Sequence, residues 1–215
     1  MNTPHRTHRG RLRVLLATKN PAKQAKLRWL LEGIDIIPAL APAWVPDMPS
    51  VAEEGVTHRE NAERKARLWS RPSHMVTIAS DGGLVIPALG ERWNGLRTKR
   101  FAGKDATEKD RLDRLLELME PYTGEQRAAY WLEAVAIADM GRILSSWTVQ
   151  SQPGLIETHY DPAAVIEGFW AFSLWRLPHW GKTYAELSRE EQDSSDGHWG
   201  QIQPLVRRFF QNRSP

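Results

Sequence analysis

Short apolar runs alternate with amphipathic segments in the first part of the chain, and this alternation restricts the fold more than any other feature. The apolar runs at 12–18, 34–37 and 76–79 have the length of buried strands. The intervening segments at 21–31 and 57–70 carry apolar residues at helical spacing. Strands that alternate with helices are typical of α/β proteins.

The later part of the chain is richer in hairpin signals. An amphipathic helix is expected from Asp105 or Thr107 to about Met119, and the runs 130–137 and 142–150 are separated by a turn at 139–141. Three further elements are expected: a strand at 169–177, a helical turn at 183–186 and a helix at 199–210. The sequence therefore predicts an α/β fold with a mixed central sheet flanked by helices.

Length and composition indicate a soluble globular protein. The 215 residues suit one medium domain, which we expect to span 11–212 after a basic, flexible tail at 1–10. No apolar run reaches the length of a membrane span, and the N-terminus lacks the apolar stretch of a secretory signal. With no cysteine, disulfides and thiolate metal sites are excluded, and we expect a cytoplasmic protein.

Two compositional features bear on partners. Basic residues gather at both ends of the chain, where they form solvated tails or contact nucleic acid. Ten tryptophans are many for this length, which suggests a dimer surface or a ligand platform. The chain carries no recognised nucleic-acid motif, so a nucleic-acid partner ranks last.

Asp81 is the strongest single candidate for chemistry. The apolar run 76–79 leads to this carboxylate, and Gly82 and Gly83 follow it, so we expect Asp81 at a strand end in a glycine turn. A carboxylate there can bind a metal ion or take a proton from water. The alternative is a turn aspartate that makes only local hydrogen bonds.

Lys23 lies in the first turn of the helix expected at 21–31. Free backbone N–H groups and the positive end of the helix dipole make such a turn suitable for phosphate. The glycines of a Walker A loop are missing from 17–23. A solvated surface lysine is the alternative.

Asn61 and Lys65 share one face of the helix expected at 57–70, where Thr57 and Glu60 have the spacing of a capping box. The acidic loop before this helix contains Glu53, and an ordinary surface helix is the alternative. Taken together, two carboxylates for a hard cation and two lysines for phosphates predict a nucleoside triphosphate site. Its members are Lys23, Glu53, Lys65 and Asp81.

These segments resemble the inosine triphosphate pyrophosphatase family. Residues 17–23 are similar to the family's A-T-x-N-x-x-K, and 53–66 to its E-x-G-x-T-x-x-E-N-A-x-x-K-A. Four more segments keep the order of family motifs: 79–84 resembles A-D-D-S-G-L, 95–100 resembles G-V-Y-S-A-R, 154–156 resembles P-G-x-I, and 181–187 resembles G-K-T-x-A-E-L. The resemblance covers residues 12 to 210.

The resemblance implies an elongated, two-lobed fold with a cleft between the lobes, usually in a homodimer. It also implies a cytoplasmic house-cleaning hydrolase of nucleotide metabolism. With Mg²⁺, water would attack the α-phosphorus of a nucleoside triphosphate and release a monophosphate and pyrophosphate. Glu53 and Asp81 would hold the metal, and Asp81 would orient or deprotonate the water.

The remaining roles also follow from the resemblance. Lys23 and Lys65 are carried over as catalytic cations, and Arg100 would join them on the phosphates. The expected substrate contacts are Thr18, Asn20, Lys23, Asn61, Lys65, Gly82, Arg100, Phe169, Lys182 and His198.

The chain departs from the family where the base is recognised. Ser80 replaces one acid, Phe172 stands for an aspartate, Gln192 for a lysine and Trp199 for an arginine. Phe169 and His198 alone remain from the base-reading set. We therefore expect a pyrophosphatase that acts on a nonstandard or modified (d)NTP, with base specificity altered from inosine and xanthosine.

Two interpretations of the aromatic residues stay open. They either line a new apolar base pocket or are core and interface residues of a protein whose base recognition has decayed. The residues concerned are Trp170, Phe172, Trp175 and Trp199. A catalytically silent nucleotide-binding or interaction protein on the same fold is the alternative function.

Overall fold

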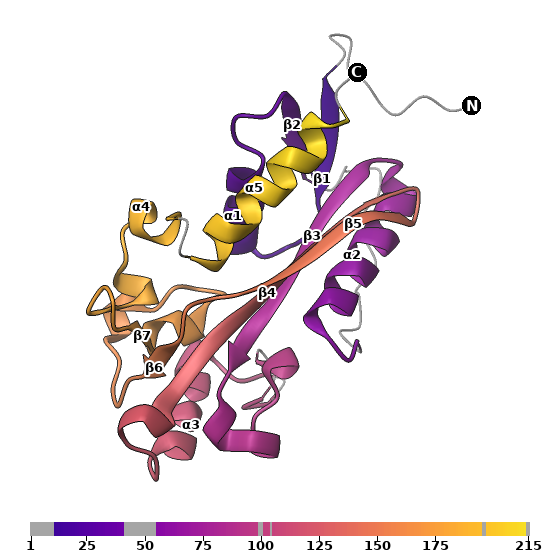
Figure 1. Ribbon diagram of the computed structural model, residues 1–215. Coiled ribbons are helices and arrows are strands. Elements are labelled where there is room, and N and C mark those ends of the chain that lie inside the picture. The colour runs from indigo at the N-terminus through magenta and orange to yellow at the C-terminus, as the bar shows by residue number, and fades with distance from the viewer. Residues whose placement is uncertain (1–10, 41–54, 99–100, 104, 195–196, 214–215) are drawn as a thin grey trace. The chain divides into compact units, whose positions relative to one another are not determined.

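The computed structural model describes residues 11–40, 55–98, 101–103, 105–194 and 197–213 (Figure 1). Its strands form one eight-stranded sheet with the order β2-β1-β3-β4-β6-β7-β8, and β5 pairs with β4 off this path. The strands are β1 (Leu12–Leu16), β2 (Ile36–Ala39), β3 (Val76–Val85), β4 (Ala128–Asp139), β5 (Arg142–Gln150), β6 (Gly154–Ile156), β7 (Trp175–Leu177) and β8 (Lys182–Thr183).

The sheet is mixed, as the sequence predicted. β1 is parallel to both β2 and β3, whereas the pairs β4–β6, β6–β7 and β7–β8 are antiparallel. Pro38 lies in β2, at one end of the strand order, where the missing N–H of proline costs no central ladder bond. The α/β class with helices flanking a mixed sheet is confirmed.

The described residues form five α-helices, and polar side chains cap the first three, two of them at residues that the sequence indicated, Thr57 and Thr107. Asn20 caps α1, Thr57 caps α2, and Thr107 caps α3 with a full capping box. At α2 the box is altered, because the Glu60 carboxylate accepts from the Val56 N–H. The helices are α1 (Pro21–Leu30), α2 (His58–Ser73), α3 (Glu108–Met119), α4 (Arg189–Gln192) and α5 (His198–Gln211).

The chain divides into two compact units. Unit 1 comprises 1–81, 133–149 and 201–215, and unit 2 comprises 82–132 and 150–200. β3, β4 and α5 each pass from one unit into the other. The expected single domain at 11–212 and the cleft remain predictions.

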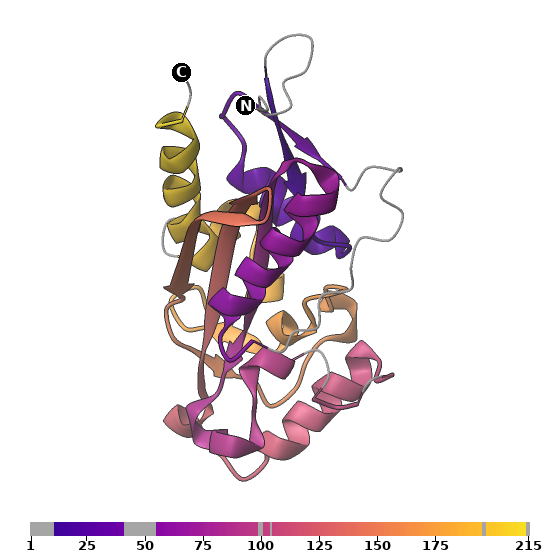
Figure 2. The same ribbon diagram turned by 90° about the vertical axis from the view of Figure 1, so that its right-hand side faces the viewer.

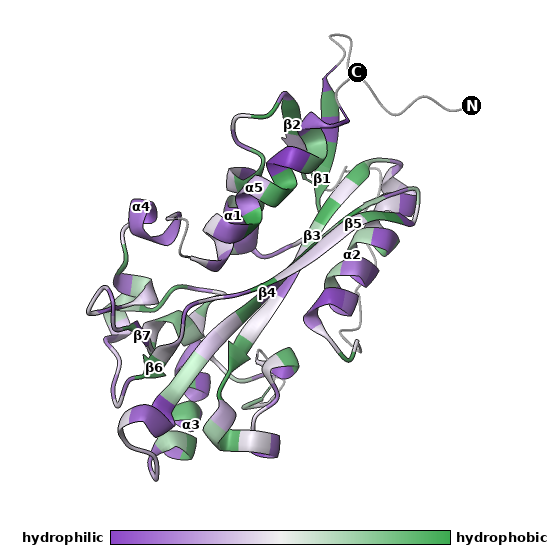
Figure 3. Ribbon diagram, in the orientation of Figure 1, coloured by the Kyte–Doolittle hydropathy of each residue, from purple (hydrophilic) through white to green (hydrophobic). Residues whose placement is uncertain are grey.

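In unit 1, α2 packs closely on the sheet through alanines. Ala62 and Ala66 have no exposed surface and join a buried cluster with Ala79, Ala134 and Ala136. Small side chains on both partners let the helix backbone approach the strands. Figure 3 shows the apolar β1 in green and much polar purple on α2, as expected for a buried strand beside a helix with one solvated face.

The two faces of β5 are covered by different helices, α2 and α5 (Figures 1 and 2). The Ser146 hydroxyl donates to the Glu63 carboxylate of α2 at 2.7 Å, whereas the Trp147 ring meets Phe209 of α5 edge-on at 6.0 Å. Successive side chains of a strand point to opposite faces, so adjacent residues contact opposite helices.

In unit 2, hydrogen bonds of the Arg127 guanidinium link the end of α3 to β6. It is buried and donates to the backbone carbonyls of Met119, Tyr122, Ile156 and Glu157. Burial lowers the pKa of Arg127, and the four carbonyl acceptors satisfy four of its five N–H groups. The described residues of both units include no helix with the length and apolar character that crossing a membrane requires.

Two expected elements are wrong. Asp81 does not lie in a glycine turn: β3 runs without interruption from Val76 to Val85, so the carboxylate projects from within a strand. Glycines 82 and 83 adopt extended backbone, which any residue can adopt, and a flanking glycine pair is therefore no reliable sign of a turn. β3 ends at Val85, and a 3₁₀ segment begins at Pro87.

The strand expected at 169–177 is also wrong for most of its length. Trp170–Ser173 forms a 3₁₀ turn, and only Trp175–Leu177 pairs as β7. A continuous apolar run does not distinguish a strand from a fully buried helical segment, and here all four residues of the turn are buried.

Candidate active site

Asp81 lies in the interior of unit 1 and is 5% exposed. A buried carboxylate must find donors, since leaving it unpaired would cost several kcal/mol by order of magnitude. β3 supplies the carboxylate, and the neighbouring helix α2 supplies the donors.

Three side chains of α2 reach Asp81. Lys65 Nζ lies 2.6 Å from Oδ1, His58 Nδ1 lies 2.8 Å from Oδ2, and Asn61 Nδ2 lies 3.3 Å from Oδ2. Positions i, i+3 and i+7 share one helical face, which is why one helix can present all three groups to a single carboxylate. The structure thus brings together the predicted residues Asn61, Lys65 and Asp81.

Positive charge keeps Asp81 ionised. Burial alone would raise the pKa of Asp81, but the hydrogen bond from His58 and the charges of Lys65 and Lys23 hold it well below the ordinary value of 3.8. Asp81 therefore carries a negative charge at neutral pH. A carboxylate with so low a pKa is a weak base, so it is better suited to orient water by accepting a hydrogen bond than to remove its proton.

Asn61 is held from both ends of its amide. Its Oδ1 accepts from the Gly55 N–H at 2.9 Å while Nδ2 points at Asp81. These two contacts determine the orientation of the amide group. A Cβ at Gly55 would lie 2.6 Å from Asn61 Oδ1, so a glycine is required for this approach.

The turn between β1 and α1 lies beside the same part of β3. Leu16 pairs with Ile78, and the Ala17 N–H donates to the Ile78 carbonyl at 2.8 Å. The turn that follows therefore begins next to the stretch of β3 that carries Asp81, and it leads into the first turn of α1 with Lys23. This parallel register explains why the charge of Lys23 acts on Asp81.

Asn20 and Thr18 have local roles in that turn. Asn20 Oδ1 accepts from the N–H groups of Ala22 and Lys23 at 2.9 and 3.3 Å, and Thr18 Oγ1 accepts from the Asn20 N–H at 3.1 Å. These contacts shape the start of α1 and orient its N-terminal backbone. Their expected substrate contacts remain predictions.

Four predicted residues belong to unit 2. Gly82 directly follows Asp81 in β3, and Phe169 and His198 are buried. Lys182 is on the surface, where Nζ pairs with Glu191 Oε1 at 2.8 Å. Glu53 and Arg100 lie outside the described residues.

The residues that depart from the family in unit 2 are packed into its interior. Phe172 is 1% exposed and Trp199 has no exposed surface. Phe169, the expected base contact, stacks on Phe172 with ring centres 4.9 Å apart and planes 16° from parallel. Gln192 donates through Nε2 to the carbonyls of Tyr184 and Leu187, so its amide serves the local fold.

His198 has no exposed surface and lies among rings. Its ring centre is 5.4 to 6.2 Å from those of the surrounding aromatic residues, Trp131, Phe172, Trp175, Tyr184 and Trp199. We call these five residues and His198 the aromatic cluster. The burial of Trp170, Phe172, Trp175 and Trp199 favours the core interpretation over an open base pocket of these rings.

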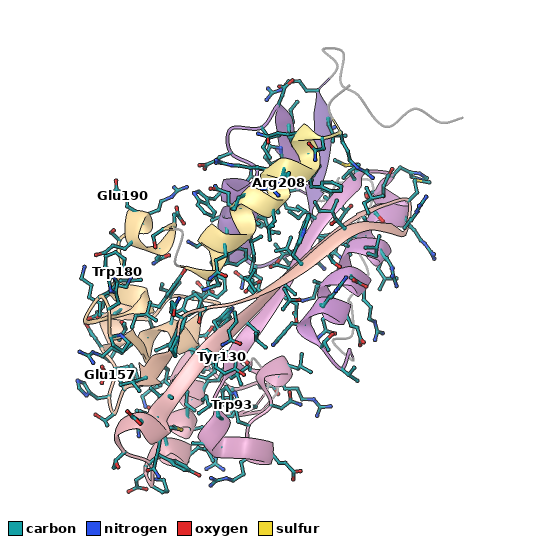
Figure 4. All side chains as sticks on the ribbon, viewed as in Figure 1. Trp93, Tyr130, Glu157, Trp180, Glu190 and Arg208 are labelled. Atoms are coloured by element: carbon teal, nitrogen blue, oxygen red, sulfur yellow. The ribbon has the colours of Figure 1, made fainter. Side chains whose placement is uncertain are left out.

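A cavity of about 520 Å³ borders one side of this cluster. Trp180, labelled in Figure 4, lies at it on the segment between β7 and β8. The other lining residues include Pro153, Trp175, Tyr184, Leu187 and His198. Of the residues expected near the base, Trp175 and His198 line this cavity, whereas Phe169 and Phe172 do not, so its relation to the expected base pocket remains a prediction.

A divalent cation fits at Asp81 only as part of a shared site. Within the described ranges, no three acidic or histidine side chains converge as a metal cluster. Three of the carboxylate's roughly four lone-pair positions face nitrogen donors, and the described residues place no donor at the fourth, which is on Oδ1. Magnesium at phosphate sites takes about one or two carboxylates and completes its shell with phosphate oxygens and water, which suits a single ligand from Asp81.

His58 is the residue that the sequence reasoning missed. The sequence of 57–60 predicts a helix cap, which the structure has at Thr57, but that pattern does not draw attention to the imidazole. The available signal was spacing: His58 stands three residues before Asn61 and seven before Lys65, on the face already assigned to the site.

The chain is similar to known proteins over most of its length. The profile of the Ham1 family matches residues 14–201. The dITP/XTP pyrophosphatase of Geobacillus kaustophilus is 34% identical over 189 residues, covering 84% of this chain and 85% of that protein. The dITP/XTP pyrophosphatase of Escherichia coli K12 is 35% identical over 202 residues, covering 90% and 95%.

The solved structures show the same fold. A HAM1 protein from Coxiella burnetii superposes with a TM-score of 0.78 at 26% identity, covering 94% of this chain and 99% of that one. Since both the family profile and full-length relatives cover most of the sequence, the chain belongs to the Ham1 family.

Proposed function

We propose that this protein is a nucleoside triphosphate pyrophosphatase that converts a (d)NTP to its monophosphate and pyrophosphate, with Mg²⁺ as cofactor. The observation that carries the proposal is the buried, ionised Asp81 with Lys65 and His58 against its two oxygens. The names of the relatives, dITP/XTP pyrophosphatases, support the same reaction.

The proposed chemistry is hydrolysis at the α-phosphorus. Asp81 accepts a hydrogen bond from the attacking water and directs a lone pair of the water at phosphorus. The new bond joins the water oxygen to the α-phosphorus, and the bond from that phosphorus to the oxygen bridging the β-phosphorus breaks. Pyrophosphate leaves with the bonding electron pair, and the proton of the water passes to the surrounding solvent or phosphate oxygens.

The lysines compensate the charge of the phosphates. The charges of Lys65 and Lys23 both act on Asp81, and Arg100 joins these two lysines in the proposal. Phosphoryl transfer depends chiefly on position and charge compensation, which lysine side chains supply as mobile point charges. Thr18, Asn20, Asn61, Gly82 and Lys182 are proposed as further substrate contacts.

Glu53 and Asp81 Oδ1 are the proposed magnesium ligands. Lys65, which contacts Oδ1 at 2.6 Å, would turn to the phosphates when substrate binds, and this would leave a second lone pair of Oδ1 for the attacking water. When bound, the ion would neutralise phosphate charge and polarise the α-phosphoryl group.

The base specificity is proposed to differ from that for inosine and xanthosine. Phe172 occupies the place of a base-reading aspartate and is buried in the aromatic cluster, and Gln192 bonds to backbone carbonyls. Phe169 and His198, the proposed base contacts, are enclosed by the same rings. These contacts support weak discrimination between bases. Few polar side chains are left to hydrogen-bond a particular base, so a wrong base would leave few of them unpaired.

A panel of standard, deaminated and modified ribo- and deoxynucleoside triphosphates tests both parts of the proposal. With Mg²⁺, pyrophosphate release is expected from at least one of them, and dITP and XTP should exceed the others by less than about 100-fold in kcat/KM. Turnover that does not differ between wild type and Asp81→Asn would overturn the site. A preference of about 10⁴-fold or more for dITP or XTP would overturn the altered specificity.

The enclosure of Phe169 and His198 also favours a second candidate, a catalytically silent nucleotide-binding protein on the same fold. Calorimetry distinguishes the two: this candidate binds a nucleoside triphosphate without releasing pyrophosphate.

A homodimer and a cytoplasmic, house-cleaning role in nucleotide metabolism complete the proposal. Light scattering after size exclusion measures the oligomeric state. Cell fractionation locates the protein, and nucleotide-pool analysis tests the house-cleaning role.

A further inference from the structure

We propose that His58 is a positioning residue for Asp81 that holds one carboxylate oxygen so that the other faces water and substrate. The inference rests on the proposed pyrophosphatase activity, and it adds a residue that neither the motif comparison nor the relatives' names assign. It is carried by a buried contact within unit 1.

The contact is short and shielded from solvent. His58 Nδ1 lies 2.8 Å from Asp81 Oδ2, and the two side chains are 7% and 6% exposed. Because Asp81 is ionised, Oδ2 can only accept, so Nδ1 carries the hydrogen and donates it. A neutral imidazole in this contact is therefore restricted to the tautomer with the hydrogen on Nδ1.

The two oxygens of the Asp81 carboxylate differ in the number of donors that contact them. Oδ2 receives both His58 and Asn61, at 2.8 and 3.3 Å, whereas Oδ1 faces Lys65 at 2.6 Å. With both its lone pairs used, Oδ2 prevents rotation of the carboxylate about its Cβ–Cγ bond. Oδ1 retains one lone pair, and the lysine beside it is the group that would also bind phosphate.

His58 is not needed to cap its helix. It occupies the first position of α2, but the Thr57 hydroxyl accepts from the Glu60 N–H and the Glu60 carboxylate accepts from the Val56 N–H. These contacts serve the helix start. The imidazole is thus available to contact Asp81, which it reaches from the first position of α2.

The test compares two substitutions at this position. His58→Phe keeps a planar ring but removes the donor, whereas His58→Asn retains an N–H donor close to the position of Nδ1. We expect His58→Phe to lower kcat by roughly 10- to 100-fold with KM within about twofold, as a misplaced catalytic group does. His58→Asn should recover at least about half of that loss on a logarithmic scale.

His74→Asn is the matched control. His74 is the exposed residue at the other end of α2 and adopts a left-handed conformation (φ 53°) that asparagine tolerates. Its kcat and KM should equal those of wild type. Circular dichroism and thermal melting of each variant separate a loss of fold from a loss of rate.

A spectroscopic measurement tests the contact without turnover. Nitrogen-15 NMR of histidine-labelled protein should show Nδ1 of His58 bearing hydrogen, and Asp81→Asn should shift that signal. A hydrogen-free Nδ1, wild-type kcat in folded His58→Phe, or no recovery in His58→Asn would each overturn the inference. If wild type releases no pyrophosphate from any substrate while the NMR contact is present, the proposed function fails and the positioning role fails with it.

Discussion

In unit 1, polar side chains from α2 converge on one buried carboxylate, whereas in unit 2 a buried imidazole is surrounded by aromatic rings. The first arrangement compensates the charge of a buried carboxylate, because each oxygen of Asp81 has a nitrogen donor. The second arrangement is one of close packing, because Phe172, Tyr184 and the tryptophans surround His198 with apolar surface. The contrast supports the proposal that unit 1 carries the groups for phosphate chemistry and that packing takes the place of polar base recognition in unit 2.

The largest expected effect concerns the charged side of the comparison. Asp81→Asn should lower kcat by at least about 10³-fold, because the amide directs an N–H where a carboxylate oxygen orients water. Pyrophosphate release measures the effect, and calorimetric nucleotide binding should persist. Retention of a tenth or more of the wild-type rate would remove Asp81 from the proposed chemistry.

The next test is made on the aromatic side. Phe172→Asp restores the acid of the family motif but places a carboxylate among rings, so unfolding should become easier by about 3–5 kcal/mol. Chemical denaturation measures this, with Phe172→Leu as the apolar control at roughly 1–2 kcal/mol. A stable Phe172→Asp variant that gains preference for dITP would show instead that this region can read a base.

A pH titration of stability examines the charge on Asp81. Its pKa is lower in the folded chain than in the unfolded chain, so its stabilising contribution is present above the unfolded pKa near 3.8 and is lost as pH falls further. Melting temperatures of wild type, measured with a chelator from pH 7 to pH 2.5, should therefore fall below pH 4. The fall should be steeper than in Asp81→Asn, and parallel curves would contradict the low pKa.

The smallest effect is expected at Lys182. Its ion pair with Glu191 involves side chains that are 45% and 20% exposed, and such pairs contribute about 0–1 kcal/mol. Lys182→Ala should change the free energy of unfolding by less than about 0.5 kcal/mol. Because Lys182 is proposed as a substrate contact at an exposed position, its removal should raise KM by about threefold with kcat unchanged. An unchanged KM would remove Lys182 from the proposed substrate contacts.

The sequence predicted those parts of the site that depend on local pattern. Asn61 and Lys65 were expected on one helical face, and they are, because helical periodicity follows directly from spacing. A shared site of Lys65 and Asp81 was expected from the charged residues taken together, and the resemblance added Asn61 as a substrate contact. The turn at Asp81 was wrong, since the local pattern of two glycines does not reveal that β3 is long enough to continue through them.

The chain by itself determined the fold class, the family and the identity of the charged residues, because strand and helix periods, caps and motif order are local properties. Only the tertiary structure decided that His58 joins Asp81 and that Phe169, Phe172 and His198 share one packed cluster. Both depend on contacts between residues far apart in the sequence. Burial also decided the charge state of Asp81, since the balance between lost solvation and nearby donors exists only once the helix lies against the strand.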